Sequence, residues 1–475
     1  MNKEIYKLKP ERVWYYFGEI LKIPRPSKKE EKIAAYILDF GKKHGLETLR
    51  DEIGNVLIRK EATQGNEKMV PVILQSHLDM VCEKNEDTVH DFDKDPIQAY
   101  IDDGWVTAKG TTLGADDGIG VATQLAILES KDIEHGPMEC LFTVDEETGL
   151  TGAFGLQPGF LKGKILLNLD SEDEGELFIG CAGGKDTIVE IPVRWIDRPE
   201  NHNTYKIKIS GLKGGHSGDD INKERGNANK LLNRILWDAN NDLNINLAHF
   251  DGGNLRNAIA REASAIVMVP EHNKEKIQKL VNDFDQKFKT EFTISDPDVA
   301  ASIEETDKPG KVMDIVTQNA LINSIYACPH GVVAMSQDIK DFVETSTNLA
   351  SVKTQANSIL ITTSQRSSVG SAKDNICNMV ASVFRLANAS VKHTDGYPGW
   401  NPNPHSKIVE ITEQAYKDLF NADPKVLAIH AGLECGLIGD KYPEMDMISY
   451  GPTLREVHSP DEKIDIETVK KFWDL

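Results

Sequence analysis

MVPVILQSHLDMV, from Met69 to Val81, is the stretch that best indicates how this chain folds. Its first part, Met69 to Gln75, is a short apolar run of the kind that forms a strand buried on both faces of a sheet. The run continues directly into Ser76 and His77, so a histidine stands at the carboxyl end of the predicted strand. The sequence therefore predicts a buried strand that presents a possible ligand at one edge of a sheet.

Three other apolar runs end in the same way, with acidic or histidine side chains just after the predicted strand. They are Glu139 to Val144 before Asp145-Glu146-Glu147, Ile165 to Leu169 before Asp170, and Met445 to Tyr450 before the loop that carries His458. In an open α/β sheet, ligands bind outside the carboxyl ends of the strands. We therefore expect these distant side chains to converge in one pocket.

Helical spacing of apolar residues appears on both sides of the first strand. Two opening helices are predicted between Pro10 and Gly45, with Gly41 close to the end of the second. A further helix is predicted from Asp117 to Leu128. It would place Asp116 at a helix N-terminus, where the helix dipole favours a negative charge.

The middle of the chain has a different pattern, which indicates a second domain inserted into the first. Tyr205, Ile207 and Ile209 alternate with lysines at the period of a half-exposed strand, and Ala228 to Ala239 has helical spacing. The glycine-rich stretch from Gly180 to Gly184 is a natural hinge in front of this segment.

These patterns predict an α/β protein with a central mixed sheet flanked by helices and an inserted α+β domain. The first domain is expected to comprise residues 1–185 and 388–475, and the inserted domain residues 186–387. At 475 residues the chain is too long for one ordinary core, which agrees with at least two domains.

Charge and composition exclude several classes of partner. With 54 basic and 75 acidic residues, the formal charge is −21, and such a surface repels phosphate backbones and anionic lipids. We therefore expect neither nucleic acid nor a membrane as a partner. Met1 to Pro10 lacks the apolar core of a signal peptide, and the six cysteines are scattered without a CxxC pair. A cytoplasmic protein with reduced thiols is the expectation.

The strongest chemical signal is a set of histidines and carboxylates at predicted strand ends and in glycine-flanked turns: His77, Asp79, Asp116, Glu146, Glu147, Asp170 and His458. Taken singly, each has an ordinary interpretation as a turn, a solvated acidic loop or a surface histidine. Gathered in one pocket, the carboxylates would repel one another unless cations neutralised them. Oxygen and imidazole ligands without thiolate suit Zn²⁺, Mn²⁺ or Co²⁺, so a two-metal hydrolytic site is a reasonable hypothesis.

The order of six motifs along the chain resembles the di-zinc exopeptidases related to carboxypeptidase G2 and aminoacylase-1. The motifs are SHLDMV (Ser76 to Val81), GTTLGADDGIG (Gly110 to Gly120), DEETGLTGA (Asp145 to Ala153), LDSED (Leu169 to Asp173), GGHSGDDI (Gly214 to Ile221) and VHSP (Val457 to Pro460). The resemblance covers nearly the whole chain. It implies the zinc-exopeptidase type of α/β fold, in which the inserted domain acts as a lid.

The resemblance also implies a role for each residue of the set. His77 and Asp170 would bind one metal ion, Glu147 and His458 the other, and Asp116 would bridge both, with Zn²⁺ expected and Co²⁺ or Mn²⁺ as alternatives. Asp79 would orient the His77 imidazole, and Glu146 would act as general base. The Asp116–Asp117 peptide bond is cis in the relatives that the chain resembles.

Three residues of the inserted domain are implied to bind substrate. His216 would stabilise the oxyanion, while Asn257 and Arg366 would hold the substrate's terminal carboxylate, for which a guanidinium is well suited. A homodimer formed through the lid domain is expected from the same resemblance. His430 and Glu434 could contact the amino end of the substrate or could be structural, and the sequence leaves both interpretations open.

The activity implied by the resemblance is metal-dependent hydrolysis of dipeptides, with Xaa-His dipeptides among the substrates. A tripeptidase and an N-acyl amino acid deacylase of the same fold are the enzymatic alternatives. A noncatalytic metal-dependent binding protein is the alternative from another class. Such proteins usually lose the base or a ligand, whereas Glu146 and all five candidate ligands are present in this chain.

Overall fold

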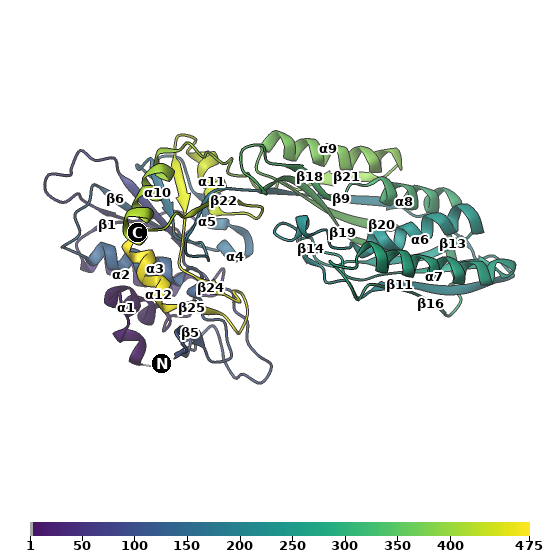
Figure 1. Ribbon diagram of the computed structural model, residues 1–475, viewed down its shortest axis with the longest axis horizontal. Helices are drawn as coiled ribbons and strands as arrows, with labels where there is room; N and C mark the ends of the chain where they lie inside the picture. The colour runs from purple at the N-terminus through teal and green to yellow at the C-terminus, as the bar shows by residue number, and fades with distance from the viewer. Residues whose placement is uncertain (1–2) are drawn as a thin grey trace. The chain divides into compact units, whose positions relative to one another are not determined.

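A computed structural model describes residues 3–475, and these residues form two compact units. Unit 1 comprises the described chain up to Cys181, Trp400–Ala428 and Leu433–Leu475. Unit 2 comprises Ala182–Gly399 and Ile429–Gly432. Figure 1 labels many of the elements of both units. Unit 2 is thus inserted in the sequence of unit 1, and the chain enters it a second time for a short segment.

An eight-stranded mixed sheet forms the centre of unit 1, in the order β1-β2-β6-β3-β7-β23-β8-β22. Its strands are β1 (Glu47–Arg50), β2 (Val56–Lys60), β3 (Val72–His77), β6 (Met138–Thr143), β7 (Ile165–Asn168), β8 (Glu176–Cys181), β22 (Lys425–Ile429) and β23 (Asp446–Ser449). The central strands β6, β3, β7 and β23 run parallel to one another. Their carboxyl ends therefore lie along one edge of the sheet, as the sequence predicted.

Helices and a small second sheet complete unit 1. The helices are α1 (Glu11–Ile20), α2 (Glu31–Lys43), α3 (Ala115–Glu129), α4 (Glu146–Gly149), α5 (Thr151–Gly155), α10 (Lys407–Phe420), α11 (Glu434–Lys441) and α12 (Ile466–Asp474). The small sheet has the order β24-β25-β5-β4, formed by Leu454–Arg455, Lys463–Asp465, Trp105–Ala108 and Ala99–Asp102. Helix α3 packs against both α1 and β3.

One local prediction in unit 1 is wrong, and another is confirmed. The run from Met69 does not become strand until Val72, and Met69 and Val70 are 57% and 54% exposed. Pro71 cannot donate a backbone hydrogen bond, which explains why pairing begins after it. Helix α2 ends at Lys43, two residues after Gly41, as predicted, and the turn that follows contains Gly45 at a φ of 68°.

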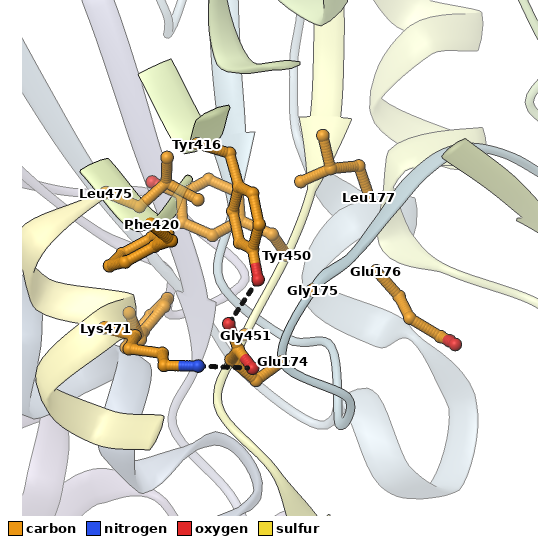
Figure 2. A pocket seen from close by; sticks show the side chains of 11 residues that line it. Glu174, Gly175, Glu176, Leu177, Tyr416, Phe420, Tyr450, Gly451, Lys471 and Leu475 are labelled. Carbon is orange, nitrogen blue, oxygen red and sulfur yellow. Dashed lines mark hydrogen bonds and ion pairs between the residues drawn. The ribbon is translucent and has the colours of Figure 1, made fainter. Parts of the chain in front are cut away.

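The contacts of α12 fix the last part of unit 1 (Figure 2). The Tyr416 hydroxyl of α10 donates a hydrogen bond of 2.5 Å to Glu174, and the Lys471 ammonium of α12 lies 3.2 Å from the same carboxylate. Tyr450 and Phe472 line the adjoining pocket. Helix α12 is thereby attached to the segment just before β8.

Unit 2 is built on a nine-stranded antiparallel sheet, in the order β16-β11-β15-β13-β19-β20-β9-β21 with β18 paired to β19. Its strands are β9 (Gly183–Pro192), β11 (His202–Ser210), β13 (Asn246–Gly252), β15 (Ala263–Pro270), β16 (Ala300–Glu305), β18 (Gly331–Met335), β19 (Val343–Thr354), β20 (Ser358–Ser367) and β21 (Ser390–His393). Shorter strand pairs are β10 (Trp195–Asp197) with β17 (Lys311–Met313), and β12 (Gly215–His216) with β14 (Ala258–Ile259). The helices are α6 (Ala228–Leu243), α7 (Lys274–Glu291), α8 (Ile315–Ala327) and α9 (Gly370–Leu386).

The alternation noted in the sequence forms the core of unit 2. Tyr205, Ile207 and Ile209 of β11 are at most 1% exposed and belong to one apolar cluster with Leu232 and Ile235 of α6. One face of the sheet is therefore covered by helices, and the intervening lysines of β11 lie on the other side of the strand. The mixed α/β fold predicted from the sequence is confirmed.

The second boundary of the inserted segment lies later than residue 387. Strand β21 pairs with β9, and the backbone of Gly184 exchanges two hydrogen bonds with Tyr397. Residues 388–399 therefore belong to unit 2. The sequence in this region carries no strong apolar alternation, so this pairing could not be predicted from it. No helix among residues 3–475 is both long and apolar enough to cross a membrane.

Candidate functional site

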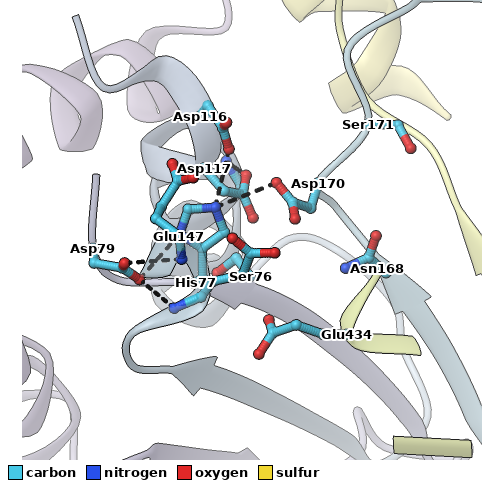
Figure 3. A network of polar contacts seen from close by, with 12 residues as sticks. Ser76, His77, Asp79, Asp116, Asp117, Glu147, Asn168, Asp170, Ser171 and Glu434 are labelled. Atoms are coloured by element: carbon cyan, nitrogen blue, oxygen red, sulfur yellow. Dashed lines mark hydrogen bonds and ion pairs between the residues drawn. The ribbon is translucent and has the colours of Figure 1, made fainter. Parts of the chain in front are cut away.

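The strand ends of unit 1 bring together side chains that the sequence singled out, and Figure 3 shows His77, Asp79, Asp116, Glu147 and Asp170 among them. His77 is the last residue of β3, and Asp170 follows β7 by two residues. Strand β6 ends at Thr143, after which a short turn leads into α4, which begins with Glu146 and Glu147. Because β3, β6 and β7 are parallel neighbours, their ends deliver these groups to one place.

Asp116 lies between two histidines at the start of α3. Its Oδ1 is 2.9 Å from His77 Nε2, and its Oδ2 is 3.1 Å from His458 Nε2. The Asp116–Asp117 peptide bond is cis, as the resemblance implies. Each oxygen of one carboxylate therefore faces a different imidazole, which is the arrangement required of a bridging ligand.

Two groups of possible metal ligands share Asp116. His77, Asp116 and Asp170 form one group, and Asp116, Glu147 and His458 form the other, with the ligand atoms of each group within 4.8 Å of one another. Glu146 and Glu147 also form a group with His77 at the same spacing. All the residues that the sequence assigned to metal binding therefore lie in one cluster.

The chemistry of this donor set fits divalent cations. Glu147 Oε2 is 3.0 Å from His458 Nε2, whereas the buried Glu147 Oε1 has no hydrogen-bond partner within residues 3–475. Hydrogen bonds that the His458 imidazole donates to the Asp116 and Glu147 carboxylates raise the pKa of His458 to about 11. The carboxylates thus hold positive charge at this imidazole, and a metal ion can supply that charge in place of a proton.

Asp79 contacts the His77 ring at Nδ1, whereas Asp116 faces Nε2 of the same ring. The Asp79 Oδ1 lies 3.4 Å from His77 Nδ1, which is the distance of an ion pair rather than of a strong hydrogen bond. The same carboxylate accepts hydrogen bonds of 3.0 and 3.2 Å from the backbone N–H groups of Glu146 and Glu147, and one of 2.7 Å from the Ser27 hydroxyl. Asp79 therefore fixes the start of α4 as well as His77.

Glu146 is a carboxylate in an environment that favours a proton. Burial raises its pKa well above the ordinary value, and the neighbouring charges of Asp170 and Glu147 add to this effect. A carboxylate with a raised pKa can both accept and return a proton near neutral pH. This property suits the role of general base that the resemblance implies.

Two buried charged residues near the site were not found from the sequence. Arg25 is 2% exposed and donates hydrogen bonds to the backbone carbonyls of Leu78, at 3.0 Å, and Gly114. Glu462 is also 2% exposed, and its carboxylate accepts hydrogen bonds from backbone N–H groups at the start of α3. Neither residue lies in one of the six motifs, and a lone arginine or glutamate gives no sign of burial in the sequence.

His430 and Glu434 lie in different units. Glu434, in unit 1, is fully buried and accepts hydrogen bonds of 2.6 Å from Gln75 and 2.7 Å from Thr143. Burial raises its pKa to about 7. His430, in unit 2, is 2.7 Å from the Ser346 hydroxyl, and burial lowers its pKa to about 3. Both side chains therefore make contacts that hold strands and loops together.

The three predicted residues of unit 2 lie near one another within that unit. Arg366 is 7% exposed, donates a hydrogen bond of 3.0 Å to the Tyr397 hydroxyl, and has its Nη2 3.4 Å from His216 Nε2. His216 Nδ1 lies 3.1 Å from Asp219. The Asn257 side chain is exposed, and its backbone carbonyl accepts a hydrogen bond of 2.8 Å from Ser217.

Comparison with known proteins gives matches over the whole chain. The pattern of peptidase family M20/M25/M40 matches residues 73–474. The cytosol non-specific dipeptidase of Escherichia coli is 44% identical over 472 residues, which cover 99% of this chain and 97% of that protein. The crystal structure of aminoacylhistidine dipeptidase from Vibrio alginolyticus superposes with a TM-score of 0.92 at 47% identity, covering 100% of this chain and 96% of the other.

More distant structures share the fold alone. Aminopeptidase PepT from Bacillus cereus matches 98% of this chain and 96% of its own, with a TM-score of 0.57 at 17% identity.

Proposed function

Because this chain belongs to peptidase family M20/M25/M40, a family of metal-dependent peptidases, we propose that it is a cytoplasmic dipeptidase with Xaa-His dipeptides among its substrates. The full-length similarity to the cytosol non-specific dipeptidase and to aminoacylhistidine dipeptidase supports this activity. The observation that carries the chemistry is the position of Asp116, whose two oxygens face His77 and His458. One carboxylate shared by two ligand groups is what a two-metal hydrolase requires.

His77 and Asp170 would hold one metal ion, Glu147 and His458 the second, and Asp116 both. Zn²⁺ suits this set of imidazole and carboxylate ligands, as do Co²⁺ and Mn²⁺. Two such ions, when bound, polarise the scissile carbonyl and lower the pKa of a water molecule. The grouping of the ligand atoms within 4.8 Å supports this assignment.

Glu146 would move the proton during hydrolysis. Its carboxylate accepts a proton from the attacking water and returns it to the nitrogen of the leaving amine. Asp79 contributes by position, since it holds the backbone N–H of Glu146 at 3.0 Å and keeps the His77 ring in one orientation.

Unit 2 would act as a lid that binds the substrate's terminal groups. Arg366 and Asn257 would bind the terminal carboxylate, and His216 the developing oxyanion. The buried Nε of Arg366, which has no hydrogen-bond partner among the described residues, supports a polar ligand there. A homodimer through this unit is part of the proposal. Exposed apolar side chains on α8 and α9, including Val316 at 72% and Met379 at 45%, support it.

The test is hydrolysis of Ala-His, Gly-Gly and an N-acetyl amino acid by the purified protein. Activity is measured before chelation, after chelation and after zinc is restored, with Glu146→Ala alongside. Zinc-restored cleavage of Ala-His that Glu146→Ala abolishes is the expected result. Preference for the acetylated substrate would indicate a deacylase, preference for tripeptides in an added arm would indicate a tripeptidase, and inactivity with full metal loading would indicate a binding protein.

A further inference from the structure

Glu462 is a buried carboxylate that the proposed reaction does not use. It lies four residues after His458 and is 2% exposed. Burying a charge is costly unless the charge is well hydrogen-bonded. The partners of Glu462 therefore indicate why the fold keeps a charge at this position.

The partners are successive backbone N–H groups at the beginning of α3. Oε2 accepts hydrogen bonds of 2.7 Å from Leu113 and 2.9 Å from Gly114, while Oε1 accepts one of 2.7 Å from Ala115. The N–H of Asp116 lies 3.4 Å from the same Oε1. N–H groups at a helix start have no acceptor within the helix, so Glu462 supplies acceptors from a remote part of the chain.

The same turn is bound from its other side by Arg25. The guanidinium donates hydrogen bonds to the carbonyl of Gly114 and to the carbonyls of Leu78 and Asp79. A side chain at position 114 would have its Cβ 2.6 Å from the Arg25 guanidinium, and the φ of Gly114 is 70°. The Gly114 peptide is thus held between a buried cation and a buried anion, with no space for a larger residue.

Glu462 links two segments of the chain, and each segment carries one candidate metal ligand. Asp116 follows directly on the turn that Glu462 binds, and His458 stands at the start of the segment that carries Glu462. His458 Nε2 is 3.1 Å from Asp116 Oδ2, and the His458 side chain is 51% exposed. An exposed loop residue has few other contacts to hold it at this distance, so the buried carboxylate fixes the separation of the two ligands.

We propose that Glu462 is a positioning residue that sets the affinity for the metal ion shared by Asp116, Glu147 and His458. The proposal rests on the two-metal site described under the proposed function. Replacement by glutamine puts an NH₂ group, which cannot accept a hydrogen bond, against backbone N–H groups. The turn before Asp116 then loses hydrogen bonds to residue 462, although the side chain is no larger. Replacement by aspartate keeps the charge but shortens the side chain by one methylene.

The experiment is a titration of metal-free protein with zinc in the presence of a competing chelator of known affinity. Isothermal titration calorimetry measures the binding. Wild type, Glu462→Gln and Glu462→Asp are compared, together with the control Glu139→Gln. Glu139 is matched because it is 3% exposed and accepts hydrogen bonds of 2.7 and 2.8 Å from the backbone N–H groups of Lys162 and Gly163. It lies at the start of β6, whereas the ligands follow the end of that strand.

Wild type and Glu139→Gln are each expected to bind two zinc equivalents, and the affinity for each equivalent should be the same in the two proteins. Both Glu462 variants are expected to bind one equivalent normally and the other about 10–100-fold more weakly. Wild-type affinity for both equivalents in Glu462→Gln would overturn the proposal. So would full affinity in Glu462→Asp combined with loss in Glu462→Gln, because charge rather than position would then be responsible.

The folding of each variant and the zinc stoichiometry of the wild type distinguish a failure of the role of Glu462 from other causes. Circular dichroism and thermal unfolding of each metal-free variant show whether it is folded, and Glu462→Asp carries the test if Glu462→Gln is not. A wild-type protein that binds fewer than two zinc equivalents would contradict the proposed two-metal site itself, separately from the role of Glu462.

Discussion

Replacing Asp79 with asparagine removes a charge that is fully buried behind the candidate site. Burial raises the pKa of Asp79, but the His77 imidazole and hydrogen bonds from the Glu146 N–H and the Ser27 hydroxyl outweigh it and lower the pKa to about 2. The ordinary value is 3.8. At about 1.4 kcal/mol for each pKa unit, ionised Asp79 stabilises the metal-free protein by about 2–3 kcal/mol at neutral pH.

The assay is thermal unfolding of chelator-treated wild type and Asp79→Asn. For a domain of this size, 1 kcal/mol corresponds to about 2–4 °C, so the variant is expected to unfold about 5–10 °C lower at neutral pH. Ser27→Ala is the control, because it removes one donor to Asp79, at 2.7 Å, and leaves the charge. It should cost about 1–2 kcal/mol.

The pH dependence gives a second check with a defined sign. A carboxyl whose pKa is lower in the folded state stabilises the protein above the unfolded pKa, and this stabilisation is lost as the pH falls through the folded pKa. The difference between wild type and Asp79→Asn should therefore be constant above about pH 4 and should shrink towards about pH 2. Equal unfolding temperatures at neutral pH, or a difference that does not shrink in acid, would refute the reasoning.

Four other predictions test neighbouring parts of the structure. Glu146→Gln should lower kcat for Ala-His about 100- to 10,000-fold while the zinc content measured by mass spectrometry stays at two equivalents, since only the proton carrier is lost; loss of zinc instead would make Glu146 a ligand. His458→Ala should reduce the zinc content from two equivalents to one. Gly114→Ala should destabilise the protein by about 1–3 kcal/mol in chemical unfolding, because position 114 has a φ of 70° and faces a buried guanidinium. Tyr397→Phe should raise KM several-fold with little change in kcat, because its hydroxyl accepts a hydrogen bond from Arg366; a fall in kcat alone would contradict this.

Much of the candidate site could be predicted because its residues follow strands with strong apolar patterns. The runs that end at His77, before Glu146 and before Asp170 mark the strands without any knowledge of their partners. Parallel pairing then brings their ends together, since side chains at the same edge of a parallel sheet are neighbours. Local pattern and global arrangement agree at these positions.

Arg25 and Glu462, which bind backbone groups next to the candidate site, could not be predicted in this way. Both residues form hydrogen bonds with backbone groups of the turn around Gly114. Since nearly every residue type carries the same backbone groups, the sequence does not show which of them a side chain will bind. A lone arginine or glutamate is most often a solvated surface residue. Only the three-dimensional structure reveals that these two are buried on opposite sides of one peptide.

The order in which the strands enter the sheet of unit 1 has a consequence for synthesis on the ribosome. Strand β23 lies between β7 and β8, although more than half of the chain separates it from them in sequence. When residue 399 has been made, unit 2 lacks only Ile429–Gly432, whereas the sheet of unit 1 still lacks β22 and also β23, the strand that joins β7 to β8. The inserted unit can thus fold while the nascent chain is still growing. The enclosing unit, and with it the proposed ligand pair of Asp116 and His458, forms only after the later strands have emerged.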